Sequence, residues 1–227
     1  MHIIAFGDIH MATGGLAAIP GIKTADLVLA NGDLSNRGGR AEARTVLDAI
    51  LVHNPRLLAQ FGNFDRPEVD GYLQDLDINL HGQARMVGGE VCLVGLGGAN
   101  PTPFNTPSEF DEEELLAIAT RAMEQGREFI ELAEPLYRHH IPLILVSHAP
   151  PRGTLVDRLH NGRHVGSSAV RTIIERYQPE LCITGHIHEA RGIDHIGKTP
   201  IYNPGALVDG HHMSITVSNV TLTPTLS

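Results

Sequence analysis

Several residue types are scarce in this chain, and each scarcity excludes a class of protein. There is no tryptophan, and aromatic residues make up only 4% of the sequence. The two cysteines, Cys92 and Cys182, lie inside the apolar runs EVCLVG and LCITG. We therefore expect buried free thiols rather than a disulfide framework or a thiolate metal site. No apolar run approaches the roughly 20 residues that a membrane-spanning helix needs, so no membrane partner is expected.

Basic residues are also in the minority. Lysine and arginine total 17 against 26 aspartates and glutamates, for a formal net charge of −9. Surfaces that bind nucleic acid or anionic membranes without sequence preference depend on clustered Lys and Arg, so nucleic acid is not expected as a partner. The overall charge does not exclude a local basic pocket. The first predicted strand begins at the first residue, with no basic segment or cleavage site, so we expect no signal peptide and a cytoplasmic location.

What the chain does have is length and histidine. Its 227 residues can bury one sizeable core, and we find no internal repeat and no linker. The expected organisation is a single domain over residues 1–227. Fourteen histidines hint at metal or phosphate chemistry.

Short apolar runs alternate with segments of helical spacing, which predicts an α/β fold. Buried strands are expected at residues 3–6, 27–30, 56–61, 142–146 and 181–184. Residues 85–87 and 90–96 read as paired strands, and short strands are expected at 190–196, 200–203, 213–217 and 220–222. Helices are predicted at 40–53, from a capping signal at Ser108 to residue 134, and from Ser167 or Ser168 to residue 177. Residues 97–107 contain too many prolines and glycines for a regular element.

Polar side chains follow five of the predicted strands, at the point where each strand ends. They are Asp8 and His10, Asp33, Asn63, His148, and His186 and His188. Alternation along an extended backbone would place Asp8 and His10 on the same side. Because ligands of α/β sheets sit beyond the carboxyl ends of strands, we expect all seven side chains to converge.

The donor atoms of this set are oxygen and imidazole nitrogen, with no thiolate. Such donors suit Mn²⁺, Fe or Zn²⁺, and the share of oxygen favours Mn or Fe. Seven donors are too many for one tetrahedral ion. They fit two divalent metal ions about 3.5–4 Å apart that share a carboxylate, an arrangement used for displacement at phosphorus.

The motifs GDIH, GDLSNRG, GNFD, SHAP and GHIH together resemble those of the calcineurin-like metallophosphoesterases. The resemblance extends from Asp8 to the YNPG run that ends at Gly205, and the stretches GGANPTPFNTPSEF and HVGSSAVRTIIE resemble a prokaryotic subgroup of small members. It implies a four-layer α/β/β/α sandwich with two mixed β-sheets.

The resemblance also implies a role for each donor. Asp8, His10 and His188 would hold the first metal, Asn63, His148 and His186 the second, and Asp33 would bridge both. A metal-bridging hydroxide would attack phosphorus. The metals and Asn63 would orient the phosphoryl oxygens and take up charge in the transition state.

One position departs from the family pattern. Members often carry a histidine after the asparagine, thought to protonate the leaving group, and this chain has Phe64 there. General acid catalysis is typically worth about 10²–10⁴-fold. The leaving group could therefore be acidic enough to depart unassisted, another residue such as His164 could supply the proton, or hydrolytic activity could be weak or absent.

Two residues outside the metal set are further candidates. Arg37, in GDLSNRG, could bind phosphate through its guanidinium, or it could be a solvated loop arginine. His164 precedes a predicted helix start where free N–H groups can hold an anion, or it could be an exposed loop histidine.

The sequence thus predicts a two-metal phosphoesterase that acts on a small phosphorylated molecule. A phosphodiester is slightly favoured, since the missing acid suits substrates with good leaving groups. The alternatives are a phosphomonoesterase, a protein phosphatase suggested by Arg37, or a metal-binding interaction module with little hydrolytic activity. A nuclease has little support, and a homo-oligomer is left open.

Overall fold

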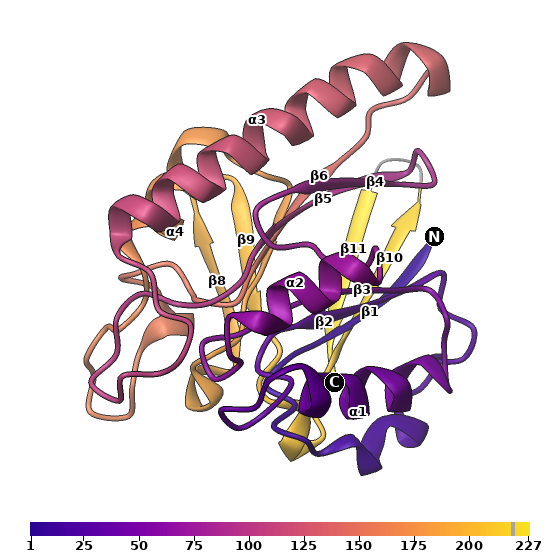
Figure 1. The fold of residues 1–227 in the computed structure, drawn as a ribbon. Helices are drawn as coiled ribbons and strands as arrows, with labels where there is room; N and C mark the ends of the chain where they lie inside the picture. The colour runs from indigo at the N-terminus through magenta and orange to yellow at the C-terminus, as the bar shows by residue number, and fades with distance from the viewer. Residues whose placement is uncertain (219–220) are drawn as a thin grey trace.

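The computed structural model describes residues 1–218 and 221–227, and its strands form two mixed sheets (Figure 1). The first sheet has the order β11-β10-β1-β2-β3, with β1 and β2 and then β2 and β3 parallel. Its strands are β1 (His2–Phe6), β2 (Leu27–Asn31), β3 (Leu57–Gln60), β10 (Met213–Ser218) and β11 (Thr221–Leu226). Val220, where the last strand was predicted to begin, lies outside the described residues.

The second sheet has the order β4-β5-β6-β7-β9-β8. Its strands are β4 (Ala84–Val87), β5 (Val91–Leu96), β6 (Leu143–Ser147), β7 (Leu181–Ile183), β8 (Gly192–Ile196) and β9 (Thr199–Asn203). Strands β5, β6, β7 and β9 run parallel, and β4 and β8 close the two edges antiparallel. The predicted pair at 85–87 and 90–96 is confirmed as β4 and β5.

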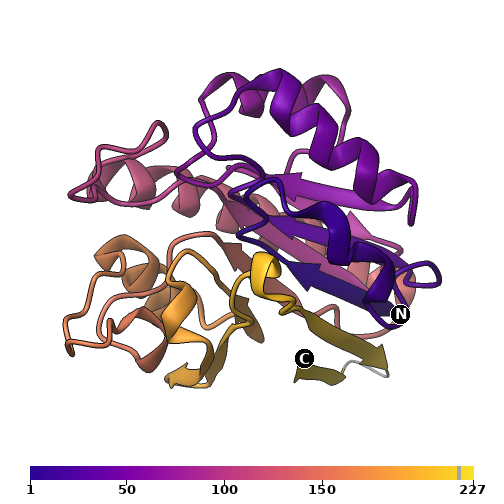
Figure 2. The same cartoon turned by 90° about the horizontal axis from the view of Figure 1, so that it is seen from below.

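The two sheets pack face to face, with helices on both outer faces. The helices are α1 (Arg40–Leu51), α2 (Glu68–Asp75), α3 (Glu112–Tyr137) and α4 (Ser168–Tyr177). Helices α1 and α2 lie on the first sheet, and α3 and α4 lie on the second (Figures 1 and 2). Apolar side chains of each helix pair pack on its sheet. A third cluster, which includes Ile3, Leu29, Leu93 and Ile144, fills the space between the sheets. The predicted α/β/β/α sandwich is confirmed.

This layering explains why the central strands are almost continuously apolar. β1, β2 and β6 are covered on both faces, so they show no polar alternation. Each large apolar side chain that leaves water on folding contributes about 1.5–3 kcal/mol. In α1 the buried residues recur at helical spacing, as predicted, so one stripe of the helix faces the sheet.

Helix α3 differs from its prediction at both ends. Its N-cap is Asp111, which accepts a hydrogen bond from the Glu114 amide, while Ser108 donates instead to the carbonyl of Asp65 at 2.6 Å. The predicted cap at Ser108 is therefore wrong, because that hydroxyl is used by a tertiary contact. The helix was predicted to run to residue 134, where Pro135 would bend or end it, but it continues through Pro135 to Tyr137. The last turn is exposed, so the carbonyl that loses its intrahelical donor can be solvated.

The parallel strands bring five strand ends to one place. The carboxyl ends of β1, β2 and β3 share one edge of the first sheet, and those of β6 and β7 share an edge of the second. Buried side chains join these edges. Asn31 Nδ2 donates to the carbonyl of Ser147 at 3.2 Å, and Gln60 Nε2 donates to the carbonyl of Val146 at 3.1 Å. The polar residues that follow the strands therefore face each other across the sandwich.

Candidate metal centre

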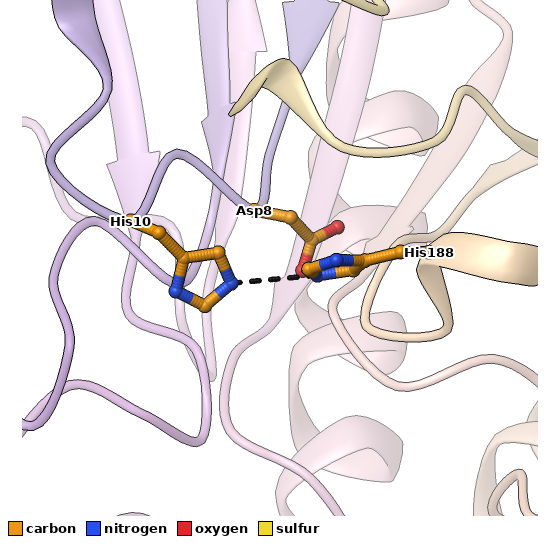
Figure 3. Close-up of side chains that lie close together, drawn as sticks. All are labelled: Asp8, His10 and His188. Atoms are coloured by element: carbon orange, nitrogen blue, oxygen red, sulfur yellow. Dashed lines mark hydrogen bonds and ion pairs between the residues drawn. The ribbon is translucent and has the colours of Figure 1, made fainter. Parts of the chain in front are cut away.

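Asp8, His10 and His188 form the first group of candidate ligands. Their donor atoms all lie within 4.8 Å of one another. The Nε2 atom of His188 lies 3.3 Å from Asp8 Oδ1 and 3.4 Å from His10 Nε2. Figure 3 shows the two rings and the carboxylate pointing toward a common centre. Asp8 is buried, whereas His188 is exposed, so this group opens toward solvent.

Asp8 and His10 meet through a turn and not through strand alternation. Both have left-handed backbones, with φ of 51° and 47°, so the predicted pairing is right and the predicted reason is wrong. The amides of Ile9 and His10 donate to the carbonyl of Asp33 at 2.9 and 2.8 Å, which pins this turn to the one after β2. Left-handed non-glycine residues are strained and tend to cluster at functional sites.

Asp33, His148 and His186 form the second group, and their donor atoms also lie within 4.8 Å of one another. His148 Nε2 lies 3.4 Å from Asp33 Oδ2 and 3.1 Å from Asn63 Oδ1. Asp33, Asn63 and His148 are at most 1% exposed. The structure therefore assembles all seven predicted donors from five separate strand ends.

Asp33 lies between the two groups and presents one oxygen to both. Its Oδ2 atom is 3.7 Å from His10 Nε2 and 3.4 Å from His148 Nε2, while Oδ1 accepts a hydrogen bond from the Phe64 amide at 2.8 Å. A Cβ atom on Gly62 would lie only 2.1 Å from Asp33 Oδ1. Glycine is therefore required where β3 ends beside this carboxylate.

Hydrogen bonds orient two of the imidazoles. The Nδ1 atom of His10 bonds to Asn36 Oδ1 at 2.9 Å, and that of His148 bonds to the carbonyl of Asn31 at 2.9 Å. Since carbonyl-type oxygens accept, each Nδ1 carries the proton and each Nε2 is left to face the group. Sequence reasoning missed both partners. Asn36 lies in the GDLSNRG motif, but the sequence carries no signal for Asn31.

In the second group, Asp33 and His148 each favour the charged form of the other, whereas His148 disfavours a charge on His186. Burial opposes ionisation of Asp33, but His148 with His10 and His186 outweighs it and lowers the pKa of Asp33. Burial likewise opposes a charge on His148, yet the carboxylates of Asp33 and Asp8 raise its pKa to about 9. Burial and the charge of His148 lower the pKa of His186 to about 4. The carboxylates of Asp33 and Asp8 thus favour a positive charge at this position, whether a proton or a bound cation supplies it.

Asp65 ties together two of the turns that carry ligands. Its carboxylate accepts from the amides of Leu34, Ser35 and Gly62 at 2.8–3.0 Å and from the Ser35 hydroxyl at 2.8 Å. Burial and the charge of Asp33 raise the pKa of Asp65 to about 6, against the effect of these donors. From the sequence we expected no catalytic role for Asp65, and the structure makes it the link between the turns after β2 and β3.

Arg37 and His164 lie outside the two groups. The Arg37 guanidinium donates to the carbonyls of Phe104 and Asn105 at 2.8 and 3.2 Å, and its Cζ atom is 5.9 Å from the centre of the Phe64 ring. Phe64 in turn meets His10 edge-on, with ring centres 5.5 Å apart, so Arg37 borders the first group through Phe64.

His164 Nδ1 bonds to Asp157 Oδ1 at 2.7 Å, and its side chain is 39% exposed. Burial opposes ionisation of Asp157, but this bond and three backbone amides lower its pKa. The structure thus gives His164 a fixed orientation, held by a buried carboxylate that sequence reasoning did not name.

The chemistry of the donor set fits two divalent ions. At metal–ligand distances of about 2.0–2.2 Å, neighbouring donors of one ion lie about 3 Å apart. The distances of 3.1–3.7 Å among the seven candidate ligands, both within and between the groups, are close to this value. Both cysteines lie in strands of the core, where burial raises the pKa of each thiol, so neither is a competing ligand.

Comparison with known proteins gives one consistent family. A family profile described as calcineurin-like phosphoesterase matches residues 1–190. The uncharacterized protein MJ1162 of Methanocaldococcus jannaschii is 35% identical over 210 residues, which cover 90% of this chain and 88% of that protein.

Two solved structures share the fold. A dimetal phosphatase from Danio rerio superposes with a TM-score of 0.63 at 12% identity, covering 100% of this chain and 95% of that one. A protein described as a novel archaeal phosphodiesterase superposes with a TM-score of 0.53 at 13% identity, with 100% of both chains covered. Among the described residues, no helix combines the length and apolar character needed to cross a membrane.

Proposed function

The chain belongs to the calcineurin-like phosphoesterase family, and from this premise we propose that it hydrolyses a small phosphorylated molecule, with a slight preference for phosphodiesters. Family membership identifies it as a metal-dependent phosphoric ester hydrolase. The observation that carries the proposal is the position of Asp33 Oδ2, within 3.7 Å of a histidine Nε2 atom in each ligand group.

In this proposal each group holds one divalent cation. Asp8, His10 and His188 hold the first, Asn63, His148 and His186 hold the second, and Asp33 bridges them. Mn²⁺ is the first choice, with Fe or Zn²⁺ as alternatives, because the donors are oxygen and imidazole. Two such cations supply a water that is ionised near neutral pH and neutralise phosphoryl charge. Asn63 also helps to orient the phosphoryl oxygens.

The preference for phosphodiesters depends on Phe64. Its amide positions Asp33, and its ring packs against His10, but a phenyl ring transfers no proton. Substrates whose leaving group departs without protonation are therefore favoured. The fold itself does not decide between the two substrate classes, since it is shared by a protein described as a phosphodiesterase and by one described as a phosphatase.

Arg37 and His164 are proposed as auxiliary residues. The Arg37 guanidinium uses two N–H groups on loop carbonyls and is exposed, so other donors remain for a phosphate oxygen. His164 is held through Nδ1 by Asp157, which leaves Nε2 to donate a proton to a leaving group. If Arg37 dominates recognition, a phosphomonoesterase or a protein phosphatase becomes the better description.

The test is the Mn²⁺-dependent rate on p-nitrophenyl phosphate and bis(p-nitrophenyl) phosphate, measured side by side at several pH values. We expect faster turnover of the diester. Faster turnover of the monoester would favour a phosphatase. If metal-loaded protein hydrolyses neither compound, a metal-binding interaction module becomes the better description of the protein.

Alongside this function we propose that residues 1–227 form a single domain located in the cytoplasm. We propose neither a membrane nor a nucleic acid as its partner.

A further inference from the structure

The side-chain amide of Asn63 is held at both ends. Its Oδ1 atom lies 3.1 Å from His148 Nε2, on the side of the second ligand group, and its Nδ2 atom donates to Thr106 Oγ1 at 2.9 Å. Asn63 is 0% exposed and Thr106 is 7% exposed. The two ends of an amide have nearly the same shape but opposite hydrogen-bonding character. Turned over, the side chain would direct an NH₂ group at the cation.

The shape of the amide therefore does not determine which way Asn63 points. The hydrogen bond to the Thr106 hydroxyl determines it. That hydroxyl has one proton, which it donates to Glu109 Oε1. The same oxygen also accepts from the Thr102 hydroxyl at 2.6 Å and from the Thr106 amide at 2.8 Å. An ionised carboxylate can only accept. Because the proton of Thr106 is committed to Glu109, the remaining capacity of Oγ1 is to accept, and only the NH₂ end of Asn63 can donate.

Glu109 stays ionised in this setting. Partial burial favours its neutral form, but the hydrogen bonds from Thr102 and Thr106 outweigh burial and lower the pKa of Glu109. The direction of the chain of hydrogen bonds is thus set by a charge that persists at neutral pH.

We propose that Thr106 and Glu109 are positioning residues that orient the Asn63 amide so that Oδ1 faces the second cation. Neither residue contacts the substrate or the reacting atoms in this proposal. They act through Asn63. The GNFD motif identifies Asn63 as a candidate ligand but does not say which end of its amide faces the cation. The inference rests on the proposed role of Asn63 as a ligand of the second cation.

Separate contacts anchor the backbone here, so the orienting effect can be isolated. The Ser108 amide donates to the carbonyl of Asn63 at 3.0 Å, and the Ser108 hydroxyl donates to the carbonyl of Asp65. These bonds hold the chain at Ser108, directly after residues 97–107, beside the turn after β3 whether or not Thr106 carries a hydroxyl. Thr106→Val keeps the shape of the side chain and removes only the polar contacts of the hydroxyl.

The experiment is calorimetric titration of the metal-free full-length protein with MnCl₂, which resolves the two binding steps. Outer-shell partners of metal ligands are typically worth about 10–100-fold in affinity. For Thr106→Val we expect one of the two steps to lose affinity by about that factor, with the other step unchanged, and Thr106→Ser should restore wild-type binding. Glu109→Gln should also weaken that step, because a neutral amide oxygen is a weaker acceptor than a carboxylate and holds the Thr106 proton less firmly.

Thr102→Val is the matched control, since it removes a hydroxyl bonded to the same Glu109 oxygen without contacting Asn63. Both binding steps should stay within about twofold of wild type. Wild-type affinity in both Thr106→Val and Glu109→Gln would overturn the proposal, as would failure of Thr106→Ser to restore binding. If Thr106→Val does not fold, as judged by its melting curve, Glu109→Gln decides alone.

The ligand assignment is tested separately with His148→Ala and Asn63→Ala. If these two variants bind both Mn²⁺ ions as wild type does, the proposed metal site fails. If they lose one ion while the Thr106 and Glu109 variants lose none, the site stands and only the positioning role fails.

Discussion

At the scale of single residues, Asp33 has the most demanding position. Its Oδ2 atom faces both histidine groups, while Oδ1 is held by the Phe64 amide. One charge therefore serves two candidate cation sites, and no neighbouring carboxylate among the described residues can take its place: Asp65 bonds to the surrounding turns and Asp8 belongs to the first group.

Asp33→Asn should consequently reduce bound metal and activity together. An amide supplies no negative charge to a bridge, and even outer-shell substitutions cost about 10–100-fold in metal affinity. We expect a loss of activity greater than about 100-fold, with fewer than two Mn²⁺ ions per chain by elemental analysis. Asp48→Asn, on the exposed side of α1, is the control. Full activity with both metals retained would remove Asp33 from the bridge.

Phe64 gives the second prediction at this scale. Phe64→His places an acid beside His10 and under the Arg37 guanidinium. If protonation of the leaving group limits turnover, kcat on alkyl phosphoesters should rise by up to about 10²-fold, the lower range for general acid catalysis. Nitrophenyl substrates, which need no acid, should change little. Equal rates for the wild-type and Phe64→His proteins on both substrate types would mean that protonation is supplied elsewhere or is not limiting.

At the scale of secondary-structure elements, the loop between α3 and β6 carries a histidine between two carboxylates. His140 Nδ1 bonds to Glu134 Oε1 at 2.7 Å, and Nε2 bonds to Glu180 Oε1 at 3.0 Å. The same glutamates accept from the amides of Ile141 and Leu143, which leads the chain into β6. Partial burial lowers the pKa of His140, but the bonds to Glu134 and Glu180 outweigh it and raise the pKa.

The sign of the resulting pH dependence follows from linkage. With a pKa raised above the unfolded value of about 6.5, His140 contributes stability that is full below that pH and is lost as pH rises through the folded value. The side chain is 52% exposed, so the contribution is about 0.2–1 kcal/mol. His140→Gln should lower the free energy of urea unfolding at about pH 5.5 and have little effect at about pH 9. His195→Gln, exposed on β8, is the control, and an equal loss at both pH values would contradict this account.

At the scale of the whole molecule, the candidate ligands come from both sheets. Asp8, Asp33 and Asn63 follow strands of the first sheet, while His148 and the two histidines after β7 follow strands of the second. Cations bound there would connect the two halves of the sandwich. Any ligand that binds only the folded state stabilises it, by about 2.7 kcal/mol at 100 times its Kd.

Removal of metal with a chelator should therefore lower the melting temperature. For a chain of this size about 2.7 kcal/mol corresponds to roughly 5–10 °C, which a thermal melt with and without Mn²⁺ would measure. His148→Ala should show a smaller shift on Mn²⁺ addition. A melting temperature that does not respond to saturating Mn²⁺ would argue against ions shared between the sheets.

The sequence by itself determined most of the elements and the set of candidate donors. Apolar runs, helical spacing and the GD, GN and GH motifs are local patterns, so β1, β2, β6, α1 and all seven donors could be predicted before any contact was known. The fold class followed from the alternation of elements and from the resemblance of the motifs. The single domain and the roles of the donors stay predictions.

Only the tertiary structure decided how the side chains of the candidate donors are oriented. Asn36 orients His10 from 26 positions away, Thr106 bonds to Asn63 across 43, and Asp65 reaches the Ser35 amide across 30. A tertiary hydrogen bond also explains why the predicted start of α3 is wrong. Ser108 bonds to the Asp65 carbonyl instead of capping the helix. Side-chain hydrogen bonds between distant loops depend on which turns the packed sheets bring within about 3 Å of each other. The local sequence pattern does not determine which distant turns those are.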